Sequence, residues 1–154
     1  MTAIMIRGIR FKIPNKWGAL LSDILQGISY DRYIWKINED QVYTEDNNFL
    51  FTNKALSGPL FKKHISTVPY YTVFINLQAF SSDHDLCEIH CYDEFIHSTC
   101  EFAVFICDNI FVDIYVKSQS DLELFHKNAL EHHFTKIEFI TDTNDTRETF
   151  RALE

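Results

Sequence analysis

The segment from Asp83 to His97 (DHDLCEIHCYDEFIH) concentrates side chains that can bind a metal ion: three histidines, two cysteines and five carboxylates in fifteen residues. Zinc takes four such ligands at about 2.0–2.3 Å, and structural zinc sites usually draw cysteines from close C-x₂₋₄-C pairs. Cys87 and Cys91 have the spacing C-x₃-C, which would place both thiols on one face of a helix. Whether this is a metal site therefore depends on the conformation of its backbone.

The residue pattern of this segment favours a strand over a helix. Leu86–Tyr92 (LCEIHCY) alternates as a strand does, and on a strand the two thiols would lie about 13 Å apart, at about 3.3 Å per residue. One ion cannot bridge that distance, and His90 would point to the opposite face. We therefore predict a structural segment with no native metal site and no cofactor. The alternative is a weaker site of two histidines and a carboxylate, with the candidates His84, His90 and His97.

A second polar stretch, TDTNDTRE at residues 141–148, is similar to the start of a calcium-binding loop. Asp142 and Asn144 match its first two ligands. Arg147, however, stands where the sharp turn requires glycine, and Leu153 where the bidentate glutamate belongs. We therefore favour a turn that ends a strand and is held by Asx hydrogen bonds. The alternative is a polar recognition loop, since loops often carry binding residues, with the candidates Asp142, Asn144, Asp145 and Arg147.

Other catalytic patterns are absent from the sequence. It contains no G-x-S-x-G elbow, no glycine-rich phosphate loop and no H-E-x-x-H. The histidines at 126, 132 and 133 fall on the last predicted helix, where the helix dipole and an ordinary i, i+3 pair with Glu123 account for them. We therefore lean against an enzyme.

Charge and hydropathy restrict the class of protein further. The net charge is −8, and because nucleic-acid affinity comes from cations that neutralise phosphate, a nucleic-acid partner is disfavoured. The longest apolar run, residues 102–107, is far too short to span a membrane. Basic residues at positions 7, 10 and 12 interrupt the N-terminal stretch, where a signal peptide needs an unbroken apolar core. These features predict a cytoplasmic protein with no membrane association.

The remaining patterns predict the elements that must position these side chains. Alternating or apolar runs predict strands, and apolar residues at i, i+3, i+4 and i+7 predict helices. The predicted strands are residues 4–13, 30–37, part of 41–51, 70–80 and 136–141, with a polar turn at 38–40. The predicted helices run from Trp17 to Ile28 with Asn15 as cap, from near Pro59, and from a Ser120/Glu123 capping box to about Phe134.

The clearest local signal is a tight hairpin. The apolar runs EFAVFIC and IFVDIYVK are joined by Asp108-Asn109, a two-residue connection typical of antiparallel strands. Both faces of the first run are apolar, so we expect that strand to be central in the sheet. One face of the strand at 70–80 is polar, so we expect that face to be at least partly exposed to solvent. That face carries Thr72, Asn76 and Gln78.

These elements predict a single globular domain over residues 1–154 with an α+β fold. We expect a mainly antiparallel twisted sheet with about three helices packed on one face. Asp113 interrupts the second run of the hairpin, and the alternation favours a solvent-facing position for it. A buried Asp113 would need a partner, because burying an unpaired carboxylate is costly.

The C-terminal half also carries a set of motifs, CYDEFIHSTCE, DNIFVDIYVK and ITDTNDTR. This set resembles an uncharacterised family of small Gram-positive, Bacillus-type bacterial proteins known only as a domain of unknown function. The resembling residues are Tyr92, Phe95, Ser98, Cys100 and Glu101; Asp108, Ile114, Tyr115 and Lys117; and Thr141, Asp142, Asn144, Asp145 and Arg147. The resemblance would cover most of the chain. It implies a bacterial cytosolic protein, and it implies no activity, cofactor or partner.

Three functions are compatible with these features. The leading one is a non-catalytic interaction protein whose acidic surface binds or neutralises a basic protein partner. An exposed patch that mixes Tyr or Trp with carboxylates would support it. The first alternative is a small metal-assisted hydrolase that uses residues 83–97 or 141–148. The second is a small-ligand sensing module with a pocket against the sheet.

Overall fold

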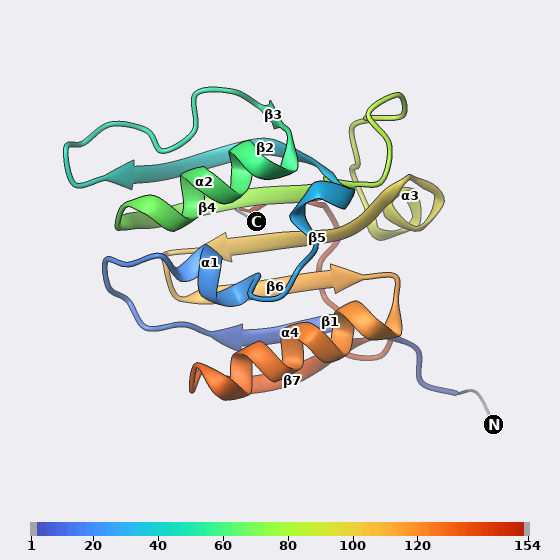
Figure 1. Ribbon diagram of the computed structural model, residues 1–154. Helices are drawn as coiled ribbons and strands as arrows, with labels where there is room; N and C mark the ends of the chain where they lie inside the picture. Colours follow the sequence, from blue (N-terminus) through green and yellow to red (C-terminus); the bar gives the residue numbers. More distant parts are fainter. Residues whose placement is uncertain (1–2, 153–154) are drawn as a thin grey trace.

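One antiparallel sheet organises the computed structural model, which describes residues 3–152 (Figure 1). Its strands are β1 (Ile6–Lys12), β2 (Ile34–Thr44), β3 (Ala55–Leu56), β4 (Tyr70–Phe80), β5 (Cys100–Cys107), β6 (Phe111–Val116) and β7 (Thr135–Thr141). They lie in the order β3-β2-β4-β5-β6-β1-β7, and every neighbouring pair is antiparallel. The predicted α+β fold with an antiparallel sheet is confirmed, and β5 is the central strand as expected.

Helices cover both faces of this sheet. They are α1 (Leu20–Ile24), α2 (Gly58–Thr67), α3 (Tyr92–His97) and α4 (Gln119–Glu131), with a short 3-10 turn η1 (Tyr30–Arg32) before β2. The helices α1, α2 and α4 share one face, in front in Figure 1, whereas α3 packs against the other. The prediction of about three helices, all on one face, therefore misses α3 on the other face. In the part of the chain described, no helix is long and apolar enough to cross a bilayer.

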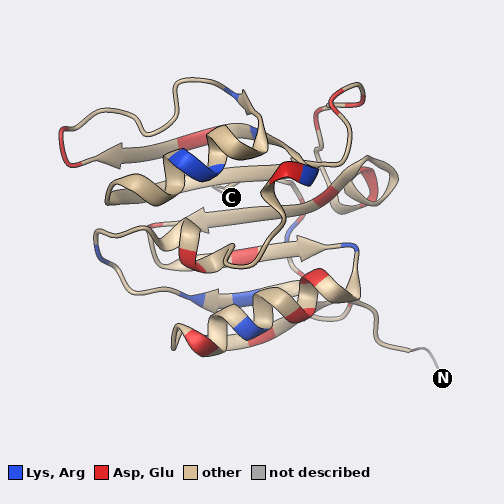
Figure 2. Ribbon diagram, viewed as in Figure 1, with Lys and Arg blue, Asp and Glu red and all other residues tan. Residues whose placement is uncertain are grey.

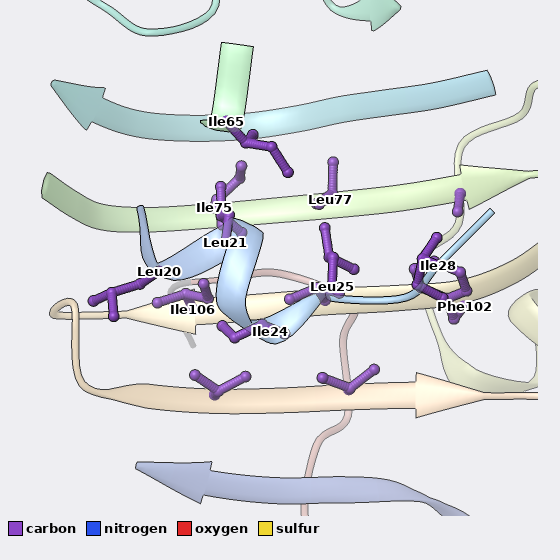
Figure 3. Close-up of a cluster of buried hydrophobic side chains, with 14 of the residues drawn as sticks. Leu20, Leu21, Ile24, Leu25, Ile28, Ile65, Ile75, Leu77, Phe102 and Ile106 are labelled. Atoms are coloured by element: carbon purple, nitrogen blue, oxygen red, sulfur yellow. The ribbon is translucent and has the colours of Figure 1, made fainter. Parts of the chain in front are cut away.

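The main core lies between the sheet and α1, α2 and α4. Figure 3 shows Leu21 and Leu25 of the α1 segment against Ile75 and Leu77 of β4. All four side chains are fully buried, and burial of a side chain of this size stabilises the fold by about 1.5–3 kcal/mol. Such burial explains why a five-residue helix, too short to be stable alone, keeps its place.

The α1 helix is shorter than its apolar periodicity predicts. Residues 20–28 bury the expected face, but Trp17 lies outside the helix and is 46% exposed. Gly18 forms a β-bridge with Tyr70, which holds the chain extended up to the helix. Asn15 does not cap α1, because its side chain instead accepts a hydrogen bond from the Tyr71 hydroxyl at 2.7 Å.

The polar turn predicted at residues 38–40 is a bulge within β2. The strand runs unbroken from Ile34 to Thr44, and its register with β4 shifts between Ile37 and Glu39. Polar residues at a bulge and at a turn look alike in sequence. The strand continues here because the eleven residues of β4 offer a partner along its whole length.

The second face of the sheet is covered too, contrary to our expectation for β4. Asn76 and Gln78 are at most 3% exposed, because residues 81–97 and the C-terminal residues 142–152 cross over them. Thr72 is buried on the other face, since a register shift in β4 sets it opposite Val42 of the main core. The Asn76 amide donates a hydrogen bond to the Phe150 carbonyl oxygen at 3.0 Å. A second core of buried residues forms here: Phe80, Ile89, Phe95, Cys100, Ala103, Phe105, Tyr115, Ile140, Phe150 and Ala152.

The cap of α4 differs from the predicted Ser120. Ser118 is the N-cap, and its hydroxyl accepts a hydrogen bond from the Asp121 backbone N–H at 3.1 Å. We expect Ser118→Ala to lower the free energy of unfolding by about 1 kcal/mol, as loss of a serine cap typically does. Ser120→Ala should change it by less than about 0.5 kcal/mol. Urea unfolding curves measure both, and equal losses in the two variants would contradict this assignment.

Candidate functional site

Residues 81–91 form a loop that leads into α3, so the strand predicted at Leu86–Tyr92 is wrong. The side chains that anchor this segment come at every third position, and they are Leu86, Ile89, Tyr92 and Phe95. This segment could not pair with β4 as a further strand, because β4 already lies between β2 and β5. Cys87 is exposed on the loop, and Cys91 is the N-cap residue of α3.

The three candidate metal ligands of this segment each pair with a neighbouring carboxylate. The pairs are His84–Asp83 (3.6 Å), His90–Glu94 (3.0 Å) and His97–Asp93 (3.7 Å). The backbone N–H of His90 also donates to Glu94, which lowers the pKa of that carboxyl group. Among residues 3–152, no three His, Cys, Asp or Glu side chains are gathered in a way that could hold a metal ion.

The loop at 141–148 contains the predicted Asx hydrogen bonds. The Asn144 side chain accepts from the Thr141 N–H at 2.7 Å and donates to the Phe139 carbonyl at 3.0 Å. Asp142 exchanges backbone and side-chain hydrogen bonds with Met5. The predicted turn after β7 is present, and Asn144 holds it by side-chain hydrogen bonds, whereas Asp142 bonds to Met5 and not within the turn.

Asp145 and Arg147, the other two loop candidates, fasten the C-terminal residues to the sheet. The Asp145 side chain is only 1% exposed and accepts hydrogen bonds from Arg7 at 2.9 Å and from the Tyr115 hydroxyl at 2.8 Å. It also accepts from the backbone N–H of Arg147. Burial and the hydrogen bond to Asp145 raise the pKa of Tyr115. Residues from β1, β6 and the C-terminal segment thus converge on one carboxylate.

A second carboxylate, Asp113 of β6, lies between two arginines. Arg10 of β1 donates to it through Nε at 2.7 Å and Nη2 at 3.2 Å, and Arg147 donates through Nη2 at 3.0 Å. The Asp113 side chain is 14% exposed, so it lies on the covered face of the sheet. The solvent-facing position predicted for it is therefore wrong. The hydrogen bond to Asp113 raises the pKa of Arg10. We call this arrangement the Arg10–Asp113–Arg147 bridge.

Two hollows of about 660 and 500 Å³ adjoin this bridge. They share Arg10, Phe111, Asp113 and Thr146, so they form one groove. Lys12 and Lys136 line the larger hollow, and Arg147 lines the smaller one. We call it the cationic groove, because its lining carries these four cations and three carboxylates, Asp113, Glu138 and Glu148.

The sequence alone did not identify this groove. Arg10 and Lys12 occupy alternate positions of β1, and Asp113 interrupts an apolar run, which are weak signals for a polar face. These residues lie beside Lys136 only because β1 pairs with both β6 and β7. The periodicity of a sequence does not predict the order of strands in a sheet.

A different surface gathers exposed aromatic side chains near the end of β2. Trp17 and Phe49 are 46% and 54% exposed. The Trp17 ring lies 5.6 Å from that of Tyr71, the Phe49 ring lies 5.1 Å from that of Tyr43, and Tyr43 pairs with Tyr71 in the register of β2 and β4. We call these four residues the aromatic ridge. The turn after β2, red in Figure 2, adds two exposed carboxylates at residues 45 and 46, and we call it the acidic turn.

Comparison with known proteins places the chain in a family. The family described as "Protein of unknown function (DUF2691)" matches residues 6–151. The "Uncharacterized protein YncE" of Bacillus subtilis (strain 168) is 35% identical over 148 residues, which cover 93% of this chain and 97% of that protein. No solved structure matches the chain. The resemblance predicted from the C-terminal motifs is thus confirmed, and the chain belongs to the DUF2691 family of proteins of unknown function.

Proposed function

We propose that this protein is a non-catalytic interaction protein that binds a basic protein partner through the aromatic ridge and the acidic turn. The observation that carries the proposal is the exposure of Trp17 and Phe49 beside two tyrosines. Single exposed apolar residues are ordinary on a protein surface, whereas adjoining ones mark interaction sites. Trp and Tyr are also the residues that most often dominate binding energy.

The charge of the protein supports a basic partner. The chain carries a net charge of −8, and Glu45 and Asp46 stand exposed next to the ridge. An excess of one sign steers a partner of the opposite sign during diffusional encounter. Association should therefore slow as ionic strength rises, because salt screens exposed charges over about 10 Å at 0.1 M.

The aromatic part of the proposal is tested by capture from a lysate of the source organism. The immobilised full chain should recover a basic protein, and Trp17→Ala/Phe49→Ala should reduce its recovery at least tenfold. Loss of one binding hot spot costs about 2 kcal/mol or more, which exceeds a tenfold change in affinity. Leu130→Ala is the matched control, because Leu130 is 56% exposed on α4. Recovery that is the same for all three baits would contradict the proposal.

The electrostatic part has its own pair of variants. Glu45→Lys/Asp46→Lys should weaken capture and reduce its dependence on salt. Glu123→Lys/Glu131→Lys changes the net charge equally on the exposed side of α4 and should retain most of the binding. Quantitative mass spectrometry of the captured proteins measures both. Equal effects of the two variants would mean that net charge, and not this surface, determines binding.

A further inference from the structure

We propose that the cationic groove binds a small phosphate-bearing molecule whose remainder has an apolar face, a mononucleotide being the simplest example. This site is lined by residues of β1, β6, β7 and the C-terminal segment, whereas the aromatic ridge lies at β2 and β4, so it is independent of the proposed protein partner. Three features of the groove support such a ligand: its net positive charge, its two lysines and the ring of Phe111.

The groove is locally cationic on an acidic protein. Its lining holds four cations against three carboxylates, while the whole chain has fourteen Lys and Arg against twenty-two Asp and Glu. The blue segments of β1 in Figure 2 belong to this region. A concave site lined by one excess sign raises the local concentration of ligands of the opposite sign. The groove is therefore where a small anion should collect.

The lysines are the cations that remain available to such an anion. Asp113 already engages both guanidinium groups of the bridge. By contrast, the Lys12 ammonium lies over the Phe111 ring at 5.2 Å, and the Lys136 ammonium has no ion-pair partner within residues 3–152. Lysine binds phosphate as a compact point charge. Two ammonium groups in one groove suit a phosphate dianion.

The backbone at Lys136 is strained in a way that fits this role. Its φ is 54°, a left-handed conformation uncommon for residues other than glycine, asparagine and aspartate. It lies at a bulge, where the register of β1 and β7 shifts between Arg10 and Lys12. Bulges often re-aim a side chain beside a functional site. A lysine at a bulge also protects an edge strand such as β7 from pairing with another chain. The position of Lys136 in the groove, together with its conformation, therefore supports the binding site.

Phe111 supplies the apolar contact. Its side chain is 47% exposed and is common to both hollows, so a flat ring can lie against it while the phosphate reaches the lysines. The hollows of about 660 and 500 Å³ have the size of small-molecule sites, which is about 300–1,000 Å³. Stacking on aromatic side chains is a general way for proteins to hold nucleobases.

Isothermal titration of the full chain tests the proposal with defined probes. The probes are the four mononucleoside monophosphates AMP, GMP, CMP and UMP, together with adenosine and inorganic phosphate. At least one mononucleotide should bind saturably with one site per chain. Adenosine and inorganic phosphate should bind at least tenfold more weakly, because each makes only part of the contacts. The proposal is overturned if no mononucleotide binds saturably or if inorganic phosphate binds as tightly as the nucleotides.

Variants locate the binding in the groove. Lys136→Asn keeps a residue that tolerates the left-handed conformation and removes the charge, and Lys12→Gln removes the second charge. Each should weaken nucleotide binding at least fivefold. Phe111→Leu should weaken nucleotide binding and leave phosphate binding unchanged. Lys63→Gln, at an exposed position of α2, is the control and should have no effect.

Thermal unfolding of each variant verifies that it is folded. Nucleotide binding that survives loss of both groove lysines, or that falls equally with Lys63→Gln, overturns the proposal. These substitutions leave the aromatic ridge intact, so they should not change capture of a protein partner. Failure of this proposal and failure of the proposed function can therefore be distinguished.

Discussion

Replacing Gly8 by alanine is expected to lower the free energy of unfolding by about 3 kcal/mol or more, since overpacking of a tight site costs about 1–3 kcal/mol and sometimes more. A Cβ atom at Gly8 would lie 1.8 Å from the backbone oxygen of Ile114 and 2.8 Å from its carbonyl carbon. Gly8 lies in β1 between Tyr115 of β6 and Ile140 of β7. The clash can be relieved only by parting β1 from β6, which would break hydrogen bonds of the sheet.

Gly18→Ala is the matched control for this prediction. A Cβ atom there would meet nothing within 4 Å, so the free energy of unfolding should change by less than about 0.5 kcal/mol. Urea unfolding or calorimetry measures both variants, and a loss of about 3 kcal/mol corresponds to roughly 6–12 °C in Tm for a chain of this length. Failure of Gly8→Ala to fold, with Gly18→Ala folded, would also agree with the prediction. Equal unfolding midpoints would show that β1 and β6 are not in such close contact.

Asp145→Ala is expected to destabilise the protein by about 3 kcal/mol, because removal of one partner from a buried ionic network leaves the other groups without compensation. The Tyr115 hydroxyl and the Arg7 guanidinium both lose the carboxylate that they contact. The Arg7 side chain is 28% exposed, so water will recover part of the loss. The C-terminal residues should also detach from the second face of the sheet, which hydrogen exchange at Phe150 would detect.

Two further variants separate this anchoring role from a general effect of the turn. Asp142→Ala removes an exposed carboxylate of the same turn and should cost less than about 1 kcal/mol. In the double variant Arg7→Met/Asp145→Ala, the loss should be smaller than the sum of the two single losses, because the residues contact each other directly. Additive losses, or a stable Asp145→Ala variant, would contradict the role of Asp145 as an anchor.

The sequence by itself determined the elements whose residue pattern is local. The alternation at 70–80 predicted β4 with its correct bounds, and the two apolar runs joined at Asp108-Asn109 predicted the β5–β6 hairpin. Both turn residues have positive φ, which asparagine and aspartate tolerate better than most side chains. The family resemblance, which rests on motifs of the C-terminal half, was also readable from the sequence.

Tertiary structure alone decided which surfaces of those elements are buried. The polar face of β4 is covered because residues 142–152 return across the sheet and place Phe150 over it. The apparent alternation at Leu86–Tyr92 produced no strand, because both edges of β4 were already paired.

The groove was likewise decided by the fold. Arg10, Asp113 and Arg147 are far apart in the chain and meet because β1 pairs with β6 while the C-terminal segment crosses β6. Periodicity reports the environment of one element at a time. The order of strands and the path of a covering segment depend on contacts between distant residues, and those contacts set the charge and shape of both proposed binding surfaces.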